Sequence, residues 1–171
     1  MKISTKTGDD GSTALMFGRR VSKNCARVRA YGAVDEFSAT LGLARAFAKG
    51  KPEAEELLHI QEKLVFLMTE LATAKEDFSL LEQKKIRVLG PDDLSEIEEK
   101  IDKMEKSGVS FSGWTHPGES PEQAALDMAR AKCRAAEREI VELENSEGLA
   151  RALPLKYINR LADYLWLLAQ K

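Results

Sequence analysis

The chain has 171 residues, 43% of them hydrophobic, which is enough for one domain with a sizeable buried core. Its 26 basic and 28 acidic residues give a net charge of -2, so the composition gives no basis for binding nucleic acid or an anionic membrane surface. Two cysteines make no disulfide framework, and neither a secretory leader nor an apolar run of membrane-spanning length is evident. These features predict a cytoplasmic protein.

Residues 1–24 are too polar for a core element, and they contain the stretch TKTGDDGST at positions 5–13. Its two glycines can turn backbone N–H groups inward, and its hydroxyls and Lys6 suit phosphate oxygens. Three basic residues follow: Arg19, Arg20 and Lys23. No Gly-Lys-Ser/Thr follows a strand, so this is not a Walker A loop. Composition leaves two interpretations open, a polyphosphate-binding loop and an ordinary polar N-terminal arm.

Two acidic residues in this stretch, Asp9 and Asp10, complicate the phosphate interpretation. Carboxylates repel bare phosphate, but they can orient a loop or face a hydrated magnesium ion.

Beyond residue 24, apolar residues recur at spacings of three and four, which predicts helices throughout. We expect helices over about 32–49 and 53–74, from Gly90-Pro91-Asp92 to Ser107-Gly108, from Ser120 to about 145, and from near Pro154 to the end. Five helices with short connections predict an all-α five-helix bundle. The predicted organisation is one domain over residues 1–171, with a polar loop at 1–24 and the bundle at 25–171.

The helix that starts at Ser120 has the strongest start signal, with Pro121 at its first position and Gln123 three residues after the cap. Spacings of three and four then align a polar stripe along it: Arg130, Arg134, Glu137 and Arg138. By itself this stripe fits a solvated ladder of ion pairs. Asp35, in the segment YGAVDE at a predicted helix start, favours a functional interpretation because its carboxylate needs a distant partner.

Other catalytic chemistry is not indicated. His59 and His116 have no neighbours at metal-ligand spacing, and His59 is expected on a helix surface. There is no Gly-x-Ser-x-Gly turn, and Cys133 falls on an apolar helix face that disfavours a reactive thiolate. We expect no zinc or iron site and no covalent catalysis by the protein.

Five separated blocks of this chain resemble the PduO-type ATP:cob(I)alamin adenosyltransferases. They are TKTGDDGST, GRRVSK, AYGAVDE, ARAKCRAAER and LKYINRLADYLWLLA, in that order. Each block is weak alone, but their order and their places on loop or helix make the resemblance specific. It covers nearly the whole chain and matches least over about residues 78–111.

The resemblance implies a five-helix bundle that assembles as a homotrimer, with ATP held between adjacent subunits. The family transfers the 5′-deoxyadenosyl group of ATP to cob(I)alamin and releases triphosphate. The residues implied to cradle the triphosphate and Mg²⁺ are Thr5, Lys6, Thr7, Gly8, Thr13 and Lys23. Those implied to reach the nucleotide from a neighbouring subunit are Arg134, Glu137, Arg138 and Asn159. Delivery of the product to an adenosylcobalamin-dependent enzyme is a further implied partnership.

The resemblance also implies a corrinoid site. In the family, an aspartate of the VDE block pairs with the first arginine of the long helix, which here are Asp35 and Arg130. Together with Arg134 they are the implied catalytic residues. A phenylalanine of the family displaces the lower axial ligand of cobalt, and this chain has Trp114 at that place. Ala135 stands where many members carry an arginine.

Two other classes of function remain alternatives. One is a non-catalytic ATP-binding bundle that acts as a corrinoid carrier or regulatory module. The other is a structural bundle whose charged stripes are solvated faces. The first predicts ATP binding without turnover, and the second predicts no ATP binding.

Overall fold

The computed structural model describes residues 4, 6–108 and 115–171, and it confirms the predicted helical bundle. The five expected helices are α1 (Ala26–Phe47), α2 (Pro52–Leu71), α4 (Pro91–Lys106), α5 (Pro121–Ser146) and α6 (Leu153–Ala169). Three elements were not predicted: the strands β1 (Ser12–Ala14) and β2 (Arg20–Ser22), and the short helix α3 (Phe78–Gln83). Short 3-10 turns cover Met16–Gly18 and Lys75–Asp77. Within the described ranges, no helix combines the length and hydropathy needed to span a bilayer.

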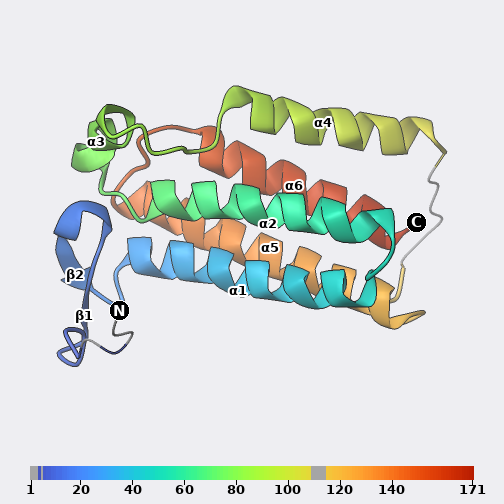
Figure 1. Ribbon diagram of the computed structural model, residues 1–171, viewed down its shortest axis with the longest axis horizontal. Coiled ribbons are helices and arrows are strands. Elements are labelled where there is room, and N and C mark those ends of the chain that lie inside the picture. Colours follow the sequence, from blue (N-terminus) through green and yellow to red (C-terminus); the bar gives the residue numbers. More distant parts are fainter. Residues whose placement is uncertain (1–3, 5, 109–114) are drawn as a thin grey trace.

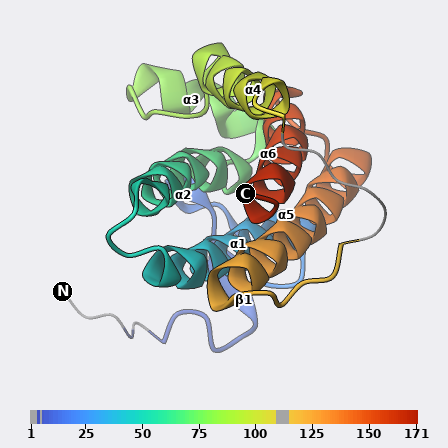
Figure 2. The same ribbon diagram turned by 90° about the vertical axis from the view of Figure 1, so that its right-hand side faces the viewer.

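Four long helices, α1, α2, α5 and α6, lie side by side along the long axis of the molecule, as Figure 1 shows. The end view in Figure 2 places α4 outside this group, where it packs against α6. The β1–β2 hairpin lies at the end of the bundle where α1 begins (Figure 1). The hairpin and the N-terminal loop therefore sit at one end of the helices, away from the α1–α2 connection.

Small side chains let α1 and α5 pack closely. Ala129, Cys133 and Ala136 of α5 are fully buried in the same cluster as Val34 and Phe37 of α1. The two helices run antiparallel, since Glu36 pairs with Lys132 at 2.8 Å and Arg29 pairs with Glu139 at 3.1 Å. Faces rich in alanine allow this close approach of two helices.

The start of α5 follows the predicted cap. The Ser120 hydroxyl accepts a hydrogen bond from the Gln123 N–H at 3.0 Å, and Pro121 occupies the first turn. The Gln123 side chain does not reach back to Ser120 but accepts from the Gly118 N–H at 2.7 Å. The cap therefore also fixes the chain just before the helix.

The start of α1 was predicted too late. The helix begins at Ala26 rather than near Gly32. Its first turns were missed because a buried charged residue, Arg27, belongs to their core side. Arg27 Nη1 donates to the carbonyls of Leu71 and Thr73 at 3.1 and 2.8 Å, and Nε pairs with Glu147 at 3.1 Å. A pattern search over apolar residues cannot recognise such a residue as core. As a result, Asp35 lies inside α1 and not at its start.

Candidate functional site

The N-terminal loop folds back on the hairpin that follows it. Strands β1 and β2 pair antiparallel with Ser12 opposite Ser22, and Lys23 follows directly after β2. The Lys23 ammonium donates to the Gly8 carbonyl at 2.7 Å. Gly11 and Lys6 both have left-handed backbone, with φ of 79° and 58°. Such a conformation costs a lysine free energy and is frequent at ligand-binding loops.

Asp10 orients this loop. Its Oδ1 accepts from the Ser12 N–H at 2.9 Å and from the Ser12 hydroxyl at 2.7 Å, and these bonds lower the pKa of the Asp10 carboxyl. Arg20 Nη2 lies 3.4 Å from the same oxygen and also contacts the Ser12 hydroxyl. Of the two roles open for the acidic pair, loop orientation is the one in which Asp10 is engaged. An Asp-x-Ser turn could have been read from the sequence.

The hairpin is anchored to the bundle by a backbone bond and an ion pair. The Met16 N–H donates to the Ala72 carbonyl at 2.9 Å, just beyond the end of α2. The Arg19 guanidinium makes two 3.0 Å hydrogen bonds to the two carboxylate oxygens of Asp77. Arg19 is therefore a hairpin anchor, whereas Arg20 and Lys23 both turn toward the loop.

Thr13 of β1 faces α1. Burial raises the pKa of the Tyr31 phenol, and a hydrogen bond with the Thr13 side chain acts in the opposite sense. This contact joins the loop side of the hairpin to the turn of α1 that precedes Asp35.

The α5 stripe is not the ladder of ion pairs that its spacing allowed. Arg134 and Arg138 are both exposed, and in the described part of the chain neither forms an ion pair. The Arg138 guanidinium donates to the Arg134 carbonyl at 3.1 Å. On the next helix, Asn159 Nδ2 donates to Glu137 Oε1 at 2.9 Å. The structure thus brings Glu137 and Asn159 together beside two guanidinium groups that form no ion pair within the described residues.

The expected pairing of Asp35 with Arg130 does not occur within one chain. Arg130 Nε pairs with Asp127 Oδ1 at 2.7 Å, and Asp127 is buried while Arg130 is half-buried. Asp35 is exposed, and the ion pairs described for this structure include none that joins it to Arg130. Arg130 pairs with Asp127 because Asp127 lies one turn away on the same helix. The α5 side chain that pairs with α1 near Asp35 is Lys132, which contacts Glu36.

Two of the predicted site residues, Thr5 and Trp114, lie outside the described residues. Close to Trp114 in sequence, Thr115 and His116 line a cavity of about 780 Å³. Its other walls include the start of α5 and the end of α6, and two ion pairs cross its rim, Lys51 with Glu122 and Lys171 with Glu53.

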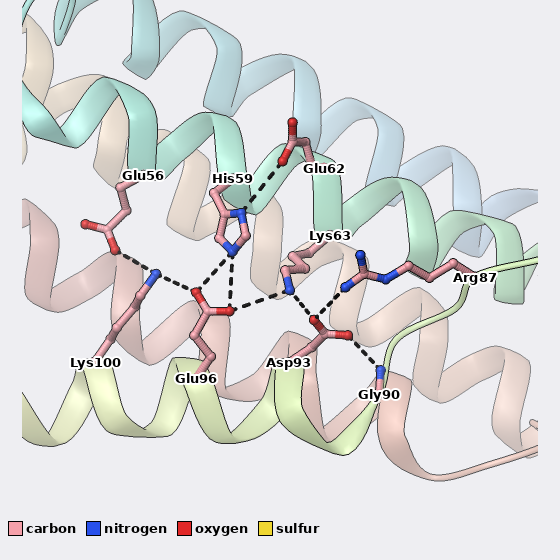
Figure 3. Close-up of polar contacts among 9 residues, drawn as sticks. All are labelled: Glu56, His59, Glu62, Lys63, Arg87, Gly90, Asp93, Glu96 and Lys100. Atoms are coloured by element: carbon pink, nitrogen blue, oxygen red, sulfur yellow. Dashed lines mark hydrogen bonds and ion pairs between the residues drawn. The ribbon is translucent and has the colours of Figure 1, made fainter.

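His59 takes part in a polar cluster between α2 and α4, drawn in Figure 3. It is partly exposed, as predicted, and its ring contacts Glu96 and Glu62 at 3.1 and 3.7 Å. Lys100 pairs with Glu96 at 2.9 Å, and the nearly buried Lys63 pairs with Asp93. No group of three or more metal-ligating side chains occurs among the residues described, so this cluster is a helix-to-helix contact.

Cys133 is excluded as a nucleophile. Burial raises the pKa of its thiol well above the usual value, and Sγ lies 3.4 Å from the Ile158 carbonyl oxygen. A neutral buried thiol of this kind is inert. The polar groups that could bind a substrate therefore lie in the N-terminal loop and in the α5–α6 stripe.

Comparison with known proteins gives one consistent result. A family model described as cobalamin adenosyltransferase matches residues 3–171. Over 170 residues the chain is 37% identical to the corrinoid adenosyltransferase PduO of Citrobacter freundii and 35% identical to a corrinoid adenosyltransferase of Bacillus subtilis. It spans only 49% of the Citrobacter protein, about half its length, but 86% of the Bacillus protein.

Solved structures of the same kind share the fold. A variant PduO-type ATP:corrinoid adenosyltransferase from Lactobacillus reuteri, complexed with cobalamin and ATP, matches with a TM-score of 0.89 at 33% identity. The match covers 99% of this chain and 92% of that one. Another variant, complexed with ATP, matches with a TM-score of 0.84 at 30% identity and covers 98% and 92% of the two chains.

Proposed function

Because the chain belongs to the cobalamin adenosyltransferase family, we propose that it transfers the 5′-deoxyadenosyl group of ATP to a cob(I)alamin-type corrinoid. The cobalt(I) electron pair forms the bond to C5′, the C5′–O bond breaks, and its electrons leave with triphosphate. The observation that carries the proposal is the α5–α6 stripe, where two exposed guanidinium groups without ion pairs flank the Glu137–Asn159 hydrogen bond. Guanidinium groups without ion pairs are available to bind the oxygens of an anion such as a polyphosphate.

The chemistry asks for positioning and charge stabilisation rather than a protein nucleophile. Cobalt(I) attacks C5′ itself, which agrees with the inert Cys133 thiol. Negative charge grows on the leaving triphosphate, and cationic donors that face it lower the barrier. Each charge-assisted hydrogen bond contributes about 1.5–3 kcal/mol.

The proposed ATP site has two parts. The loop part supplies backbone amides, hydroxyls and cations from these residues: Thr5, Lys6, Thr7, Gly8, Thr13 and Lys23. The stripe part supplies Arg134, Glu137, Arg138 and Asn159. The contacts of Arg20 with Thr7 and of Lys23 with Gly8 stay within the loop and the hairpin, and those of Arg138 with Arg134 and of Asn159 with Glu137 stay on α5 and α6. A second copy that brings its stripe to this loop would complete the site.

A homotrimer is the assembly that we propose, following the family resemblance. Leu43 and Phe47 are one turn apart on α1, 46% and 48% exposed, and Met128 on α5 is 55% exposed. Because Glu36 pairs with Lys132 in the antiparallel contact, Met128 lies level with the turn of α1 before Leu43. These side chains make an apolar surface over α1 and α5 that a neighbouring subunit would cover.

The proposed corrinoid site comprises Asp35, Arg130 and Trp114. Exposed Asp35 has no partner for its charge in its own chain among the described residues, so a neighbouring subunit's Arg130 is the partner we propose. The cavity beside Thr115 and His116 has the size of a ligand pocket and could accommodate part of a corrinoid.

Mg²⁺ is proposed as the companion of the triphosphate. It keeps most of its water and prefers phosphate and carboxylate oxygens. Asp10 is engaged with Ser12 and Arg20, whereas the neighbouring Asp9 is exposed and forms no ion pair within the described residues. Asp9 is thus the loop carboxylate that fits a hydrated Mg²⁺. The free thiols of Cys25 and Cys133 fit a reducing compartment, and we propose the cytoplasm.

One anaerobic assay tests the proposed activity. Chemically reduced cobalamin is mixed with protein and ATP, and the loss of the cob(I)alamin absorbance is followed together with triphosphate release. Equal amounts of adenosylated product and triphosphate are expected. ATP binding without this conversion would instead support the non-catalytic carrier, and the absence of ATP binding would support a structural bundle.

A further inference from the structure

Two cations hold successive carbonyls of the N-terminal loop. Arg20 Nη2 donates to the Thr7 carbonyl at 2.7 Å, and Lys23 Nζ donates to the Gly8 carbonyl at 2.7 Å. None of the described peptide bonds is cis. In a trans peptide the carbonyl of one residue and the N–H of the next point in opposite directions. The N–H groups of Gly8 and Asp9 therefore point away from the two cations.

Successive backbone N–H groups of a loop are the donors from which anion-binding sites are built. Within the part of the chain that the structure describes, neither the Gly8 N–H nor the Asp9 N–H donates a backbone hydrogen bond. Gly8 presents no side chain that would cover them, and Asp9 is exposed. The direction of the amides depends on the carbonyls, and the carbonyls depend on the two cations.

Arg20 is better fixed than a flexible surface arginine. Its backbone pairs with Ala14 in the β ladder, and Ser12 lies diagonally opposite on the same face of the hairpin. Its Nη2 contacts the Thr7 carbonyl, the Asp10 carboxylate and the Ser12 hydroxyl. One guanidinium thus connects the start, the middle and the end of the loop.

We propose that Arg20 is a positioning residue for the nucleotide: it holds the Thr7 carbonyl and so turns the Gly8 N–H toward the triphosphate. The inference rests on the proposed function, since that function identifies the anion as a polyphosphate. Arg20 acts through the loop backbone and does not contact the phosphate itself. Its charge is already balanced by Asp10, which Ser12 keeps ionised by lowering the pKa of the Asp10 carboxyl.

The test compares Arg20→Ala, Arg20→Lys and the matched control Arg19→Ala, which loses the same charge from the same hairpin. Binding of ATP and of inorganic tripolyphosphate is measured by calorimetry, and the amide signals of Gly8 and Asp9 are followed by NMR. Arg20→Ala should weaken both ligands by about ten-fold or more and abolish the amide shifts. Arg20→Lys should not restore binding, because the lysine side chain is one atom shorter than the path to Nη2 and its ammonium would fall short of the Thr7 carbonyl. Arg19→Ala should bind like the wild type.

Three results would overturn the positioning role. They are unchanged binding by Arg20→Ala, an equal loss in Arg19→Ala, and rescue by Arg20→Lys, which would indicate simple charge attraction. If Arg20→Ala does not fold, as judged by its thermal transition, Arg20→Lys decides alone. Failure of the proposed function is a different result, in which the wild type itself binds neither ATP nor tripolyphosphate.

Discussion

Lys23 and Gly8 are joined by a 2.7 Å hydrogen bond from the Lys23 ammonium to the Gly8 carbonyl. A Cβ placed on Gly8 would lie 2.9 Å from that ammonium and 3.1 Å from the Ser12 carbonyl oxygen. A glycine is therefore required for the ammonium to lie against this turn of the loop.

Gly8→Ala should displace the Lys23 ammonium and raise the KM for ATP by about ten-fold, because one charge-assisted hydrogen bond is disturbed. The thermal midpoint should change little, since a flexible lysine end can move and the loop is exposed. Gly32→Ala is the matched control: nothing lies within 4 Å of its added Cβ, and a helical position favours alanine by about 1 kcal/mol. Normal ATP kinetics in Gly8→Ala would mean that Lys23 is not part of the nucleotide site.

Arg134→Ala should lower kcat/KM more than Lys23→Ala does, because a guanidinium can hold two phosphate oxygens in fixed geometry. A loss of about 100-fold is expected, equivalent to roughly 2.7 kcal/mol of transition-state stabilisation. Lys132→Ala, on the α1-facing edge of the same helix, is the control and should retain activity. Steady-state kinetics with reduced cobalamin measure both. Equal activity of the two variants would indicate that the stripe is only a solvated face of the helix.

Met128→Glu should dissociate the assembly and abolish ATP binding together, since it places a charge in the proposed apolar interface. Val65→Glu on α2 is the matched control, because Val65 is 53% exposed and Met128 is 55% exposed. Sedimentation velocity and ATP titration at the same protein concentration report the two effects. A monomer that binds ATP with full affinity would contradict a site shared between subunits.

The α2–α4 cluster should make stability depend on pH below 5. Burial raises the pKa of Glu96, but hydrogen bonds from Lys100 and His59 outweigh it and hold the value at about 2. Because the folded pKa lies below the unfolded value of about 4.5, the stabilisation is present above pH 4.5 and is lost as the pH falls toward 2. Urea unfolding at several pH values should show a steeper decline in the wild type than in Glu96→Gln. Parallel declines would remove Glu96 from the acid response.

Trp114→Ala should leave ATP binding nearly intact while turnover falls, if the indole excludes the lower axial base of the corrinoid. Trp114→Phe should preserve much of the activity. Electron paramagnetic resonance of cob(II)alamin with protein and ATP measures the four-coordinate species directly. A joint loss of thermal stability and ATP affinity, with no selective change in the cobalt signal, would mean that Trp114 only packs its loop.

The sequence by itself determined the long helices, because their apolar period and their caps are local. Ser120 with Gln123 marks the start of α5, and the bond between them is the one expected from their spacing. The family was also recognisable, since five short blocks retain their order. The hairpin was missed because strands of three residues are too short for an alternating pattern.

Only the tertiary structure decided which polar groups meet. Arg27 belongs to the core although it is charged, because the Thr73 carbonyl just beyond the end of α2 accepts a hydrogen bond from its guanidinium. Arg130 pairs with Asp127 of its own helix and not with Asp35 of α1, the partner that the resemblance implied. Spacing along the chain predicts which residues share a face of one helix. Which side chain of a neighbouring helix they contact depends on the rotation and register of the two helices. Those are properties of the packed bundle as a whole, since every helix must bury its apolar side at the same time.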